Sequence, residues 1–187
     1  MRRKLSSIRK IIWLLIITAF LISSFFLIMR AVYPLRYHEH IKKYSEKYDL
    51  DEHLVMAIIK AESNYIHDAH SGYAGGLMQI TDETGKWISE QLNIGFNHED
   101  IHNPEKNIKM GCYYMSYLLS HYDNNLDVAL AAYNAGMGNV NKWLKNPEYS
   151  PDGKNLSYVP YEETREYVKK VKEYKETYKR LYPSDGS

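Results

Sequence analysis

The stretch AIIKAESNY, residues 57–65, places one acidic residue, Glu62, at the end of an apolar run. Leu54, Ile58 and Glu62 are spaced by four residues, so a helix would project the carboxylate from the face that seeks the core. Partial burial raises the pKa of a carboxyl group toward the range in which it can deliver a proton at neutral pH. Glu62 is therefore a candidate general acid. The alternative is a structural residue at the helix end, exposed to solvent or paired with a base such as Lys60.

Three more motifs follow Glu62–Ser63 along the chain. They are Gly75-Gly76-Leu77-Met78-Gln79, then Ala131-Ala132-Tyr133-Asn134-Ala135-Gly136, then Pro160-Tyr161-Glu162-Glu163-Thr164-Arg165-Glu166-Tyr167-Val168. In this order the four motifs resemble the catalytic domain of the lytic transglycosylases, the lysozyme-like enzymes that cleave the glycan strands of bacterial peptidoglycan. The resemblance covers about residues 41–181. It implies a mainly α fold, a lysozyme-like helical domain of the goose-type or transglycosylase kind.

The resemblance implies that Glu62 is the catalytic acid and base. It would protonate the oxygen that links N-acetylmuramic acid (MurNAc) to N-acetylglucosamine (GlcNAc), and then take the proton of the muramic C6 hydroxyl as that oxygen closes on C1. The product would be a 1,6-anhydro sugar, and water would not be consumed. One carboxylate would suffice because the substrate's own acetamido group would stabilise the oxocarbenium-like centre. No cofactor and no metal are implied.

The resemblance also assigns sugar-binding residues to the loop after the Glu62 helix. Gly76 and the glycine before it would let the backbone approach a sugar ring, while Met78 would give an apolar wall and Gln79 a hydrogen-bonding amide. Ser71 is included, although the usual motif has one more residue between this Ser and the Gly-Leu-Met-Gln block. A second departure is Thr81, which stands where the family often has Pro. The structural alternative for the two glycines is an ordinary turn.

Three further residues are carried over from the later motifs. Tyr133 and Asn134 would point from a helix end toward the same cleft, with Tyr133 orienting Glu62 or the acetamido group. Glu163 would contact sugar without acting in catalysis. The structural alternatives are a core position for Tyr133 and, for Glu163, a place in a first helical turn, where an acid interacts favourably with the helix dipole.

The stretch His98-Glu99-Asp100-Ile101-His102 competes with this interpretation, because it matches the H-E-x-x-H pattern of zinc proteases. That pattern binds zinc only on a helix, where the two His lie one turn apart. Here Asn97 precedes the stretch and Asn103-Pro104 follows it, so turn residues bound it on both sides. We therefore expect no zinc site.

Two other residue types invite a functional interpretation. Cys112 is the only cysteine, and its place in an apolar helical pattern predicts a buried small side chain. The chain also has 18 tyrosines, whose flat rings suit sugar faces. Those nearest the motifs, namely Tyr65, Tyr73, Tyr133 and Tyr161, are the better candidates for substrate contact.

The elements that must position these residues are predicted from hydrophobic periodicity and from turn residues. We expect a helix from Asp49 or Asp51 to Ser63, helices over 81–92, 104–122 and 126–134, a short helical turn over 140–144 and a last helix over 161–181. Residues 65–76 and 146–160 should be loops. No alternating run is long enough to predict a strand.

The first thirty residues differ from the rest. No charged residue occurs from Ile11 to Met29, and 19 mostly bulky apolar residues would span a bilayer as a helix of about 30 Å. Bulky residues up to Arg30 favour a retained anchor over a cleaved signal peptide. We therefore expect, by residue number, a cytoplasmic basic tail over 1–10, a transmembrane anchor over 11–29, a linker over 30–40, the lytic transglycosylase catalytic domain over 41–182 and a tail over 183–187.

Localisation follows from the expected substrate. Basic residues flank the apolar span on both sides, so charge alone does not fix its orientation. A catalytic domain that meets peptidoglycan must lie outside the cytoplasm, so we expect a single-pass cell-membrane protein with a cytoplasmic N-terminus. The formal net charge of +1 gives no reason to expect nucleic acid as a partner. The expected partners are peptidoglycan glycan strands, the membrane through the N-terminal helix and, as a candidate, a wall-spanning secretion or conjugation apparatus.

Two alternative functions remain open from the sequence. A goose-type lysozyme-like hydrolase would use the same Glu62 and leave reducing ends in place of anhydro ends. A wall-binding module of a secretion or conjugation apparatus would bind peptidoglycan without cutting it.

Overall fold

The computed structural model describes residues 2–183 of the chain, with side chains from residue 9 onward. The chain divides into two compact units between Leu35 and Arg36. Most of the predicted C-terminal tail, residues 184–187, lies outside the described residues, and so do the side chains of the first eight residues of the predicted basic tail.

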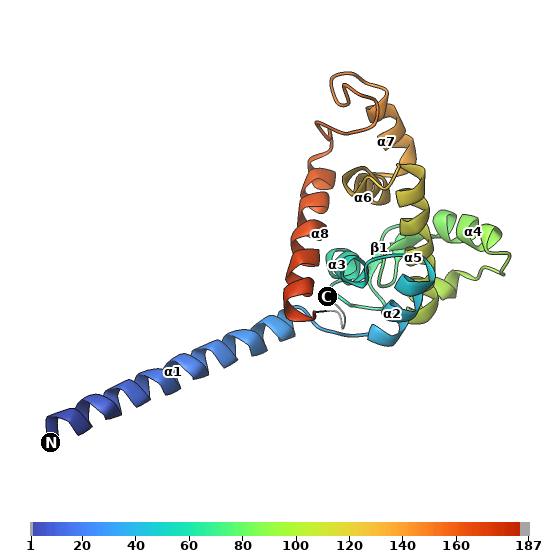
Figure 1. Ribbon diagram of the computed structural model, residues 1–187. Coiled ribbons are helices and arrows are strands. Elements are labelled where there is room, and N and C mark those ends of the chain that lie inside the picture. The colour runs from blue at the N-terminus through green and yellow to red at the C-terminus, as the bar shows by residue number, and fades with distance from the viewer. Residues whose placement is uncertain (1, 184–187) are drawn as a thin grey trace. The chain divides into compact units, whose positions relative to one another are not determined.

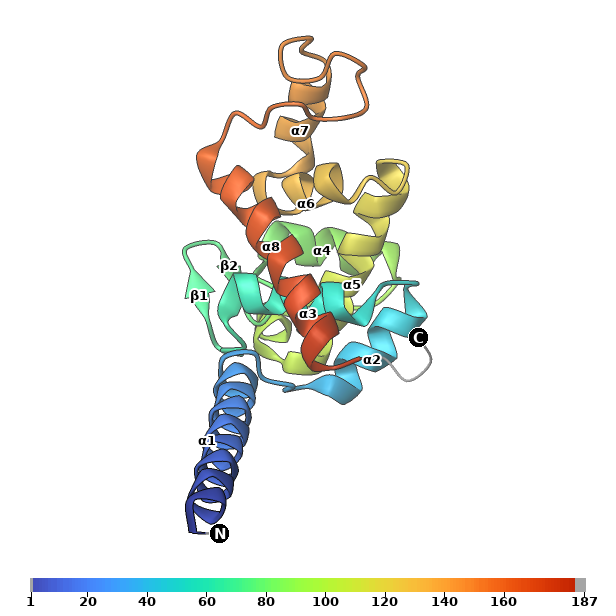
Figure 2. The same cartoon turned by 60° about the vertical axis from the view of Figure 1, so that its left-hand side comes forward.

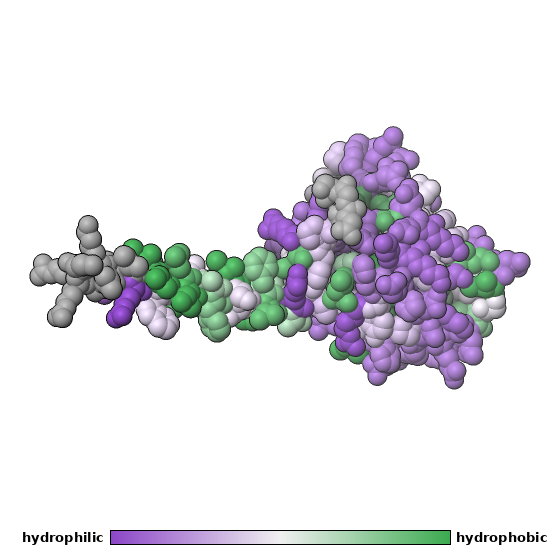
Figure 3. Space-filling model, turned by 60° about the horizontal axis from the view of Figure 1, so that its bottom comes forward, coloured by the Kyte–Doolittle hydropathy of each residue, from purple (hydrophilic) through white to green (hydrophobic). Residues whose placement is uncertain are grey.

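The first unit consists mainly of one helix, α1 (Arg2–Val32). It covers the whole apolar span predicted over 11–29, and Figure 3 shows mostly hydrophobic side chains over this span. Its segment from Arg9 to Val32 is long and apolar enough to cross a membrane by length and composition. None of this segment is buried against other parts of the described chain, so its apolar surface needs another environment to cover it.

The second unit is mainly helical, as predicted (Figure 1). In chain order its elements are α2 (His38–Lys47), α3 (Glu52–Ser63), β1 (His70–Ser71), β2 (Ala74–Gly75), β3 (Ile80–Thr81), α4 (Asp82–Gln91), the 3-10 helix η1 (His98–His102), α5 (Pro104–His121), α6 (Leu126–Ala135), α7 (Met137–Leu144) and α8 (Glu162–Leu181). The predicted helices are confirmed to within a few residues at their ends. Helix α2 and the three short strands were not predicted.

Side-chain caps explain where several of these helices begin. The Asp51 side chain accepts a hydrogen bond from the backbone N–H of His53 and so begins α3. Asn103 and Asn125 cap α5 and α6 in the same way, and Pro104 occupies the first turn of α5. Gly136 has a φ of +82°, which a residue with a side chain rarely adopts, and it ends α6 immediately before α7.

Helix α3 packs mainly against α8, which lies beside it in Figure 1 and crosses in front of it in Figure 2. Its residues from His53 to Ile59 are all buried. Helix α8 buries only Thr164, Tyr167, Val171 and Tyr178 against its neighbours. Its other apolar residues, Val168, Tyr174 and Leu181, are partly exposed, so α8 covers α3 through a narrow stripe.

A small antiparallel sheet connects α3 to α4. Its strand order is β1-β2-β3, and Gly75 pairs with His70 on one side and Ile80 on the other. Each strand has two residues, which is too short for the alternation of apolar and polar residues that predicts strands from sequence. The segment predicted as a loop over 65–76 therefore contains a hairpin.

Candidate active site

Glu62 lies in the last turn of α3, and its side chain is half-buried. Burial raises its pKa from an ordinary value of 4.5 to about 7. The Tyr167 hydroxyl and the charge of Lys170 lower this pKa, while the charge of Glu163 raises it. Burial dominates, so Glu62 holds its proton near neutral pH, as a general acid requires.

One face of α8 faces this carboxylate. Glu163, Tyr167 and Lys170 are four and three residues apart, so they lie one above the other along the helix, and all three act on the pKa of Glu62. The face places a negative charge, a phenol and a positive charge along one line. These three groups of α8 therefore adjust a pKa that burial has already raised.

Tyr167 is a candidate site residue to which the sequence motifs assigned no role. Its side chain is only 5% exposed, and its hydroxyl has no partner at hydrogen-bond geometry in the described part of the chain. The hydroxyl still lies close enough to Glu62 to lower the pKa of that carboxyl group. Its position in the last quoted motif, five residues after Glu162, was the available signal.

Tyr133 reaches the same place from α6. Its hydroxyl donates a hydrogen bond to the carbonyl oxygen of Met78 over 2.9 Å. Burial and the nearby Glu62 charge raise the pKa of Tyr133, so its hydroxyl stays protonated. The structure thus brings Tyr133 to Glu62, with its proton directed to Met78. Its role in orienting Glu62 or an acetamido group stays a prediction.

Ser71 and Gln79 are brought together across the hairpin. The Ser71 hydroxyl donates to the Gln79 amide oxygen over 2.5 Å, and the Gln79 amide nitrogen donates to the carbonyl oxygens of Ala69 (3.2 Å) and Gly76 (2.9 Å). In this arrangement the Gln79 amide holds the loop together. Contact of Ser71 or Gln79 with a sugar stays a prediction.

Gly76 and Met78 are packed against protein atoms. A Cβ on Gly76, whose φ is +78°, would lie 2.0 Å from the Ile101 carbonyl oxygen and 2.4 Å from the Asn107 amide nitrogen. Met78 has no exposed surface and packs on Gly111, so in this structure its side chain is part of the core and gives no open apolar wall. The close backbone approach that requires Gly76 is therefore an approach to Asn107.

Asn107 is a buried polar residue of α5 that the sequence analysis did not single out. Its amide nitrogen donates to the carbonyl oxygens of Gly75 (3.0 Å) and Ile101 (2.7 Å), and its side-chain oxygen accepts from the Met78 backbone N–H (2.7 Å). These bonds fix the Gly-Gly-Leu-Met segment on α5. Ser63 adds a bond from the end of α3 to the Leu77 carbonyl oxygen.

A pocket of about 550 Å³ lies between the end of α6 and the start of α8. Asn134, Tyr161 and Glu163 line it, and Asn134 accepts a hydrogen bond from the Thr164 hydroxyl over 2.7 Å. Glu163, which lines this pocket, is also one of the charges that act on the pKa of Glu62. Of the tyrosines expected near substrate, Tyr161 lines the pocket and Tyr73 is exposed at the hairpin tip, whereas Tyr65 is buried, so that expectation was wrong for Tyr65.

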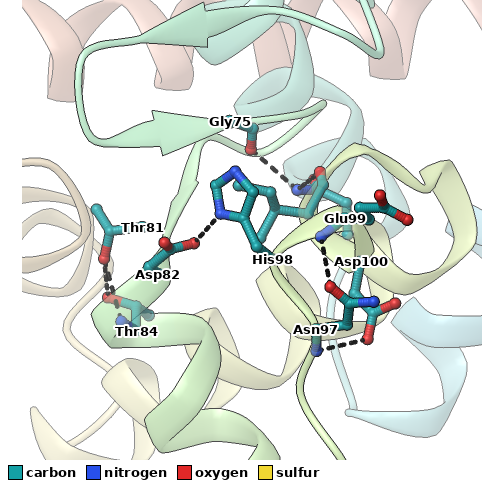
Figure 4. Close-up of polar contacts among 10 residues, drawn as sticks. Gly75, Thr81, Asp82, Thr84, Asn97, His98, Glu99 and Asp100 are labelled. Atoms are coloured by element: carbon teal, nitrogen blue, oxygen red, sulfur yellow. Dashed lines mark hydrogen bonds and ion pairs between the residues drawn. The ribbon is translucent and has the colours of Figure 1, made fainter.

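The H-E-x-x-H stretch forms the 3-10 helix η1 and not an α-helix (Figure 4). A 3-10 helix has about three residues per turn, so it lacks the α-helical turn on which this pattern presents two His to one metal ion. The His98 and His102 rings, 6.0 Å apart between centroids, meet edge to face. His98 instead pairs with Asp82 of α4 through Nδ1 over 2.7 Å, and His102 lies against Gly75. Within residues 2–183 no group of three His, Cys, Asp or Glu side chains is placed to hold a metal ion.

Cys112 is buried, as predicted.

Comparison with known proteins adds a family to this geometry. Residues 39–156 match the family described as "Transglycosylase SLT domain". The soluble lytic murein transglycosylase of Escherichia coli K12 is 34% identical over 157 residues, and a membrane-bound lytic murein transglycosylase C of Serratia proteamaculans is 32% identical over 122 residues. These matches cover 82% and 56% of this chain, and 24% and 32% of the relatives. The chain thus spans about a quarter to a third of the length of these relatives.

Solved structures show the same fold. A lytic transglycosylase from Pseudomonas aeruginosa, solved as an inactive variant with one Glu replaced by Gln, superimposes with a TM-score of 0.73 at 31% identity. That match covers 81% of this chain and 25% of the other. The 70-kDa soluble lytic transglycosylase of Escherichia coli gives a TM-score of 0.74 at 30% identity, covering 83% and 26% of the two chains. The predicted lysozyme-like helical fold is confirmed.

Proposed function

This chain belongs to the transglycosylase SLT domain family, and on that premise we propose that it is a peptidoglycan lytic transglycosylase. Its reaction is cleavage of the β-1,4 bond between MurNAc and GlcNAc, with formation of 1,6-anhydroMurNAc. The observation that carries the proposal is Glu62, a half-buried acid whose pKa of about 7 suits proton transfer in both directions at neutral pH.

In the first step, protonated Glu62 donates its proton to the glycosidic oxygen as the bond to muramic C1 breaks. The departing sugar leaves with this proton, and the acetamido group of the muramic residue supports the positive charge at C1. Glu62 is then a carboxylate. The Tyr167 hydroxyl and the Lys170 charge both favour that charged form.

In the second step, the Glu62 carboxylate takes the proton of the muramic C6 hydroxyl, and the C6 oxygen closes on C1. The enzyme returns to its starting protonation state without consuming water. One carboxylate performs both proton transfers, whereas two-carboxylate glycosidases need a second acid to attack or to activate water. Glu163 raises the pKa of Glu62 and lines the pocket between α6 and α8. We propose that it contacts substrate there.

The remaining predicted residues position the glycan. We propose that Tyr133 and Asn134 contact the sugar beside Glu62, and that Ser71, Gly76 and Gln79 shape the loop that borders it. Met78 contributes through its carbonyl oxygen, which holds the Tyr133 hydroxyl.

The N-terminal helix and a membrane-bound relative support association with a membrane. We propose that α1 crosses the cell membrane once, with the N-terminus in the cytoplasm and the catalytic unit outside it, where peptidoglycan lies. A wall-spanning secretion or conjugation apparatus is the partner class that would need such local cutting. Cysteine accessibility on both sides of intact and permeabilised cells tests the orientation, with a cysteine introduced at Ser6 expected to react only after permeabilisation.

The catalytic proposal is tested with Glu62→Gln, with Glu176→Gln on the exposed face of α8 as the control. The parent chain and the control should release muropeptides that end in anhydroMurNAc, detected by mass spectrometry, and Glu62→Gln should release none. Reducing ends in place of anhydro ends would identify a hydrolase of the goose type. Equal clearing of cell-wall suspensions by Glu62→Gln and the parent would refute catalysis by Glu62.

A further inference from the structure

A continuous row of aromatic side chains leads away from the candidate active site along α5. We call Trp87, Tyr114, Tyr117 and His121 the aromatic row. The Trp87 ring lies 6.1 Å from Tyr114 and 4.8 Å from Tyr117, measured between ring centroids, and Tyr117 lies 5.9 Å from His121. Three members come from α5, and Trp87 comes from α4, which packs beside α5 (Figure 1).

The spacing of the row places its members on one face of α5. Tyr114, Tyr117 and His121 are three and four residues apart, so they lie one above the other over about 10 Å of helix. Trp87, Tyr114 and Tyr117 are partly exposed, and His121 is exposed. The row therefore presents accessible ring surface in addition to packing α4 on α5.

The row begins at the proposed catalytic centre. The Tyr114 ring centroid lies 5.4 Å from that of Tyr133, whose hydroxyl bonds the Met78 carbonyl oxygen and whose pKa the Glu62 charge raises. Tyr114 is therefore the member of the row that lies next to Tyr133, and the row extends from there along α5. Flat aromatic rings pack well against sugar faces, because they offer apolar area at a small cost in side-chain entropy.

The row ends at a polar pocket. His121 and Tyr122 line a pocket of about 430 Å³ between the end of α5, helix α7 and the loop after it. The other lining residues include three with side-chain amides, Asn125, Asn141 and Asn155, and two charged residues, Asp123 and Lys154. Hydrogen bonds hold the amides in place, from the Tyr122 hydroxyl to Asn141 (3.0 Å) and from Asn125 to Asn155 (2.7 Å).

The aromatic rings and the side-chain amides suit the same kind of ligand. Neutral amides both donate and accept hydrogen bonds, which suits the hydroxyl and acetamido groups of amino sugars. From this combination we infer that the glycan strand continues from the cleavage site across the aromatic row, and that a further sugar of the strand occupies the pocket lined by His121 and the three amides. The inference rests on the proposed function, because it extends the substrate of that site. A glycan site extended in this way makes the enzyme prefer long glycan strands to short fragments.

Binding can be measured without cutting in the full chain that carries Glu62→Gln. The probes are MurNAc–GlcNAc strands stripped of stem peptides, one long fraction and one short fragment that fills only the cleavage site. Adding Trp87→Leu keeps an apolar side chain between α4 and α5 but removes the flat ring. It should weaken binding of the long fraction about tenfold, or about 1.4 kcal/mol. Trp87→Phe should restore most of the affinity.

The control is Tyr113→Leu. Tyr113 also contacts Trp87, at 6.2 Å, but its ring packs on Tyr48 and it is not a member of the row. This variant should bind the long fraction as the parent does. An affinity loss that is equal for long and short probes, no loss at all, or an equal loss in Tyr113→Leu would overturn the inference.

The outcome is separable from the fate of the proposed function. If the parent chain releases no anhydro ends, the proposed function fails, while length-dependent binding by the Glu62→Gln chain still supports a glycan site on the row. If anhydro ends appear but Trp87→Leu leaves the binding of both probes unchanged, the function stands and the aromatic row only packs α4 on α5.

Discussion

Replacing Glu62 by Gln is expected to stabilise the folded protein at pH 8, although the same change removes the proposed acid. Burial raises the pKa of Glu62 from 4.5 to about 7, so the folded chain holds this proton over a pH range in which the unfolded chain has released it. The contribution of the neutral carboxyl group to stability is therefore complete below about pH 4.5 and is lost as the pH rises to about 7. Above that pH, folding must bury a charge.

The size of the effect follows from this interval. A difference of one pKa unit between the two states corresponds to about 1.4 kcal/mol, so the interval from 4.5 to about 7 gives an upper bound of about 3.4 kcal/mol. Because the Glu62 side chain keeps part of its surface in solvent, the expected cost at pH 8 is about 1–3 kcal/mol. Gln has nearly the same shape and no charge, so it avoids this cost.

Urea unfolding of both full chains in mild detergent, followed by tryptophan fluorescence, measures the difference. The free energy of unfolding of Glu62→Gln should exceed that of the parent by about 1–3 kcal/mol at pH 8 and by less than about 0.5 kcal/mol at pH 4. Glu176→Gln, on an exposed face of α8, should differ little from the parent at either pH. A variant that is less stable than the parent at pH 8, or equally stabilised at both pH values, would refute the burial argument.

Three further predictions concern the groups around this acid. Glu163→Gln removes a charge that raises the pKa of Glu62, so the alkaline limb of the pH–rate profile on glycan strands should move to lower pH, whereas Lys170→Met should move it to higher pH. Asn107→Ala leaves three buried backbone groups without their partner and should lower the free energy of unfolding in urea by at least about 3 kcal/mol. Gly76→Ala places a Cβ in a left-handed backbone position 2.0 Å from a carbonyl oxygen, and it should lower the thermal midpoint by several degrees.

Helix positions were largely predictable because they depend on local patterns. Asp51 before α3, Pro104 in α5 and Gly136 after α6 are signals that act within a few residues, and the structure confirms the helices that they bound. The strands of the hairpin escaped prediction, since two residues give no periodicity. The H-E-x-x-H stretch was rightly doubted as an α-helix because the turn residues that bound it are also local.

The sequence by itself determined the mainly helical class, the apolar N-terminal span and Glu62 as the acid on a core-facing stripe. Only the tertiary structure decided what surrounds that acid. The three α8 groups that modify the pKa of Glu62 lie about 100 residues downstream, and the Asn107 bonds to the Gly75 and Met78 backbone cross about 30 residues. Helix and turn signals come from neighbours along the chain, whereas the electrostatics of a buried carboxyl group depend on whichever side chains the fold brings against it.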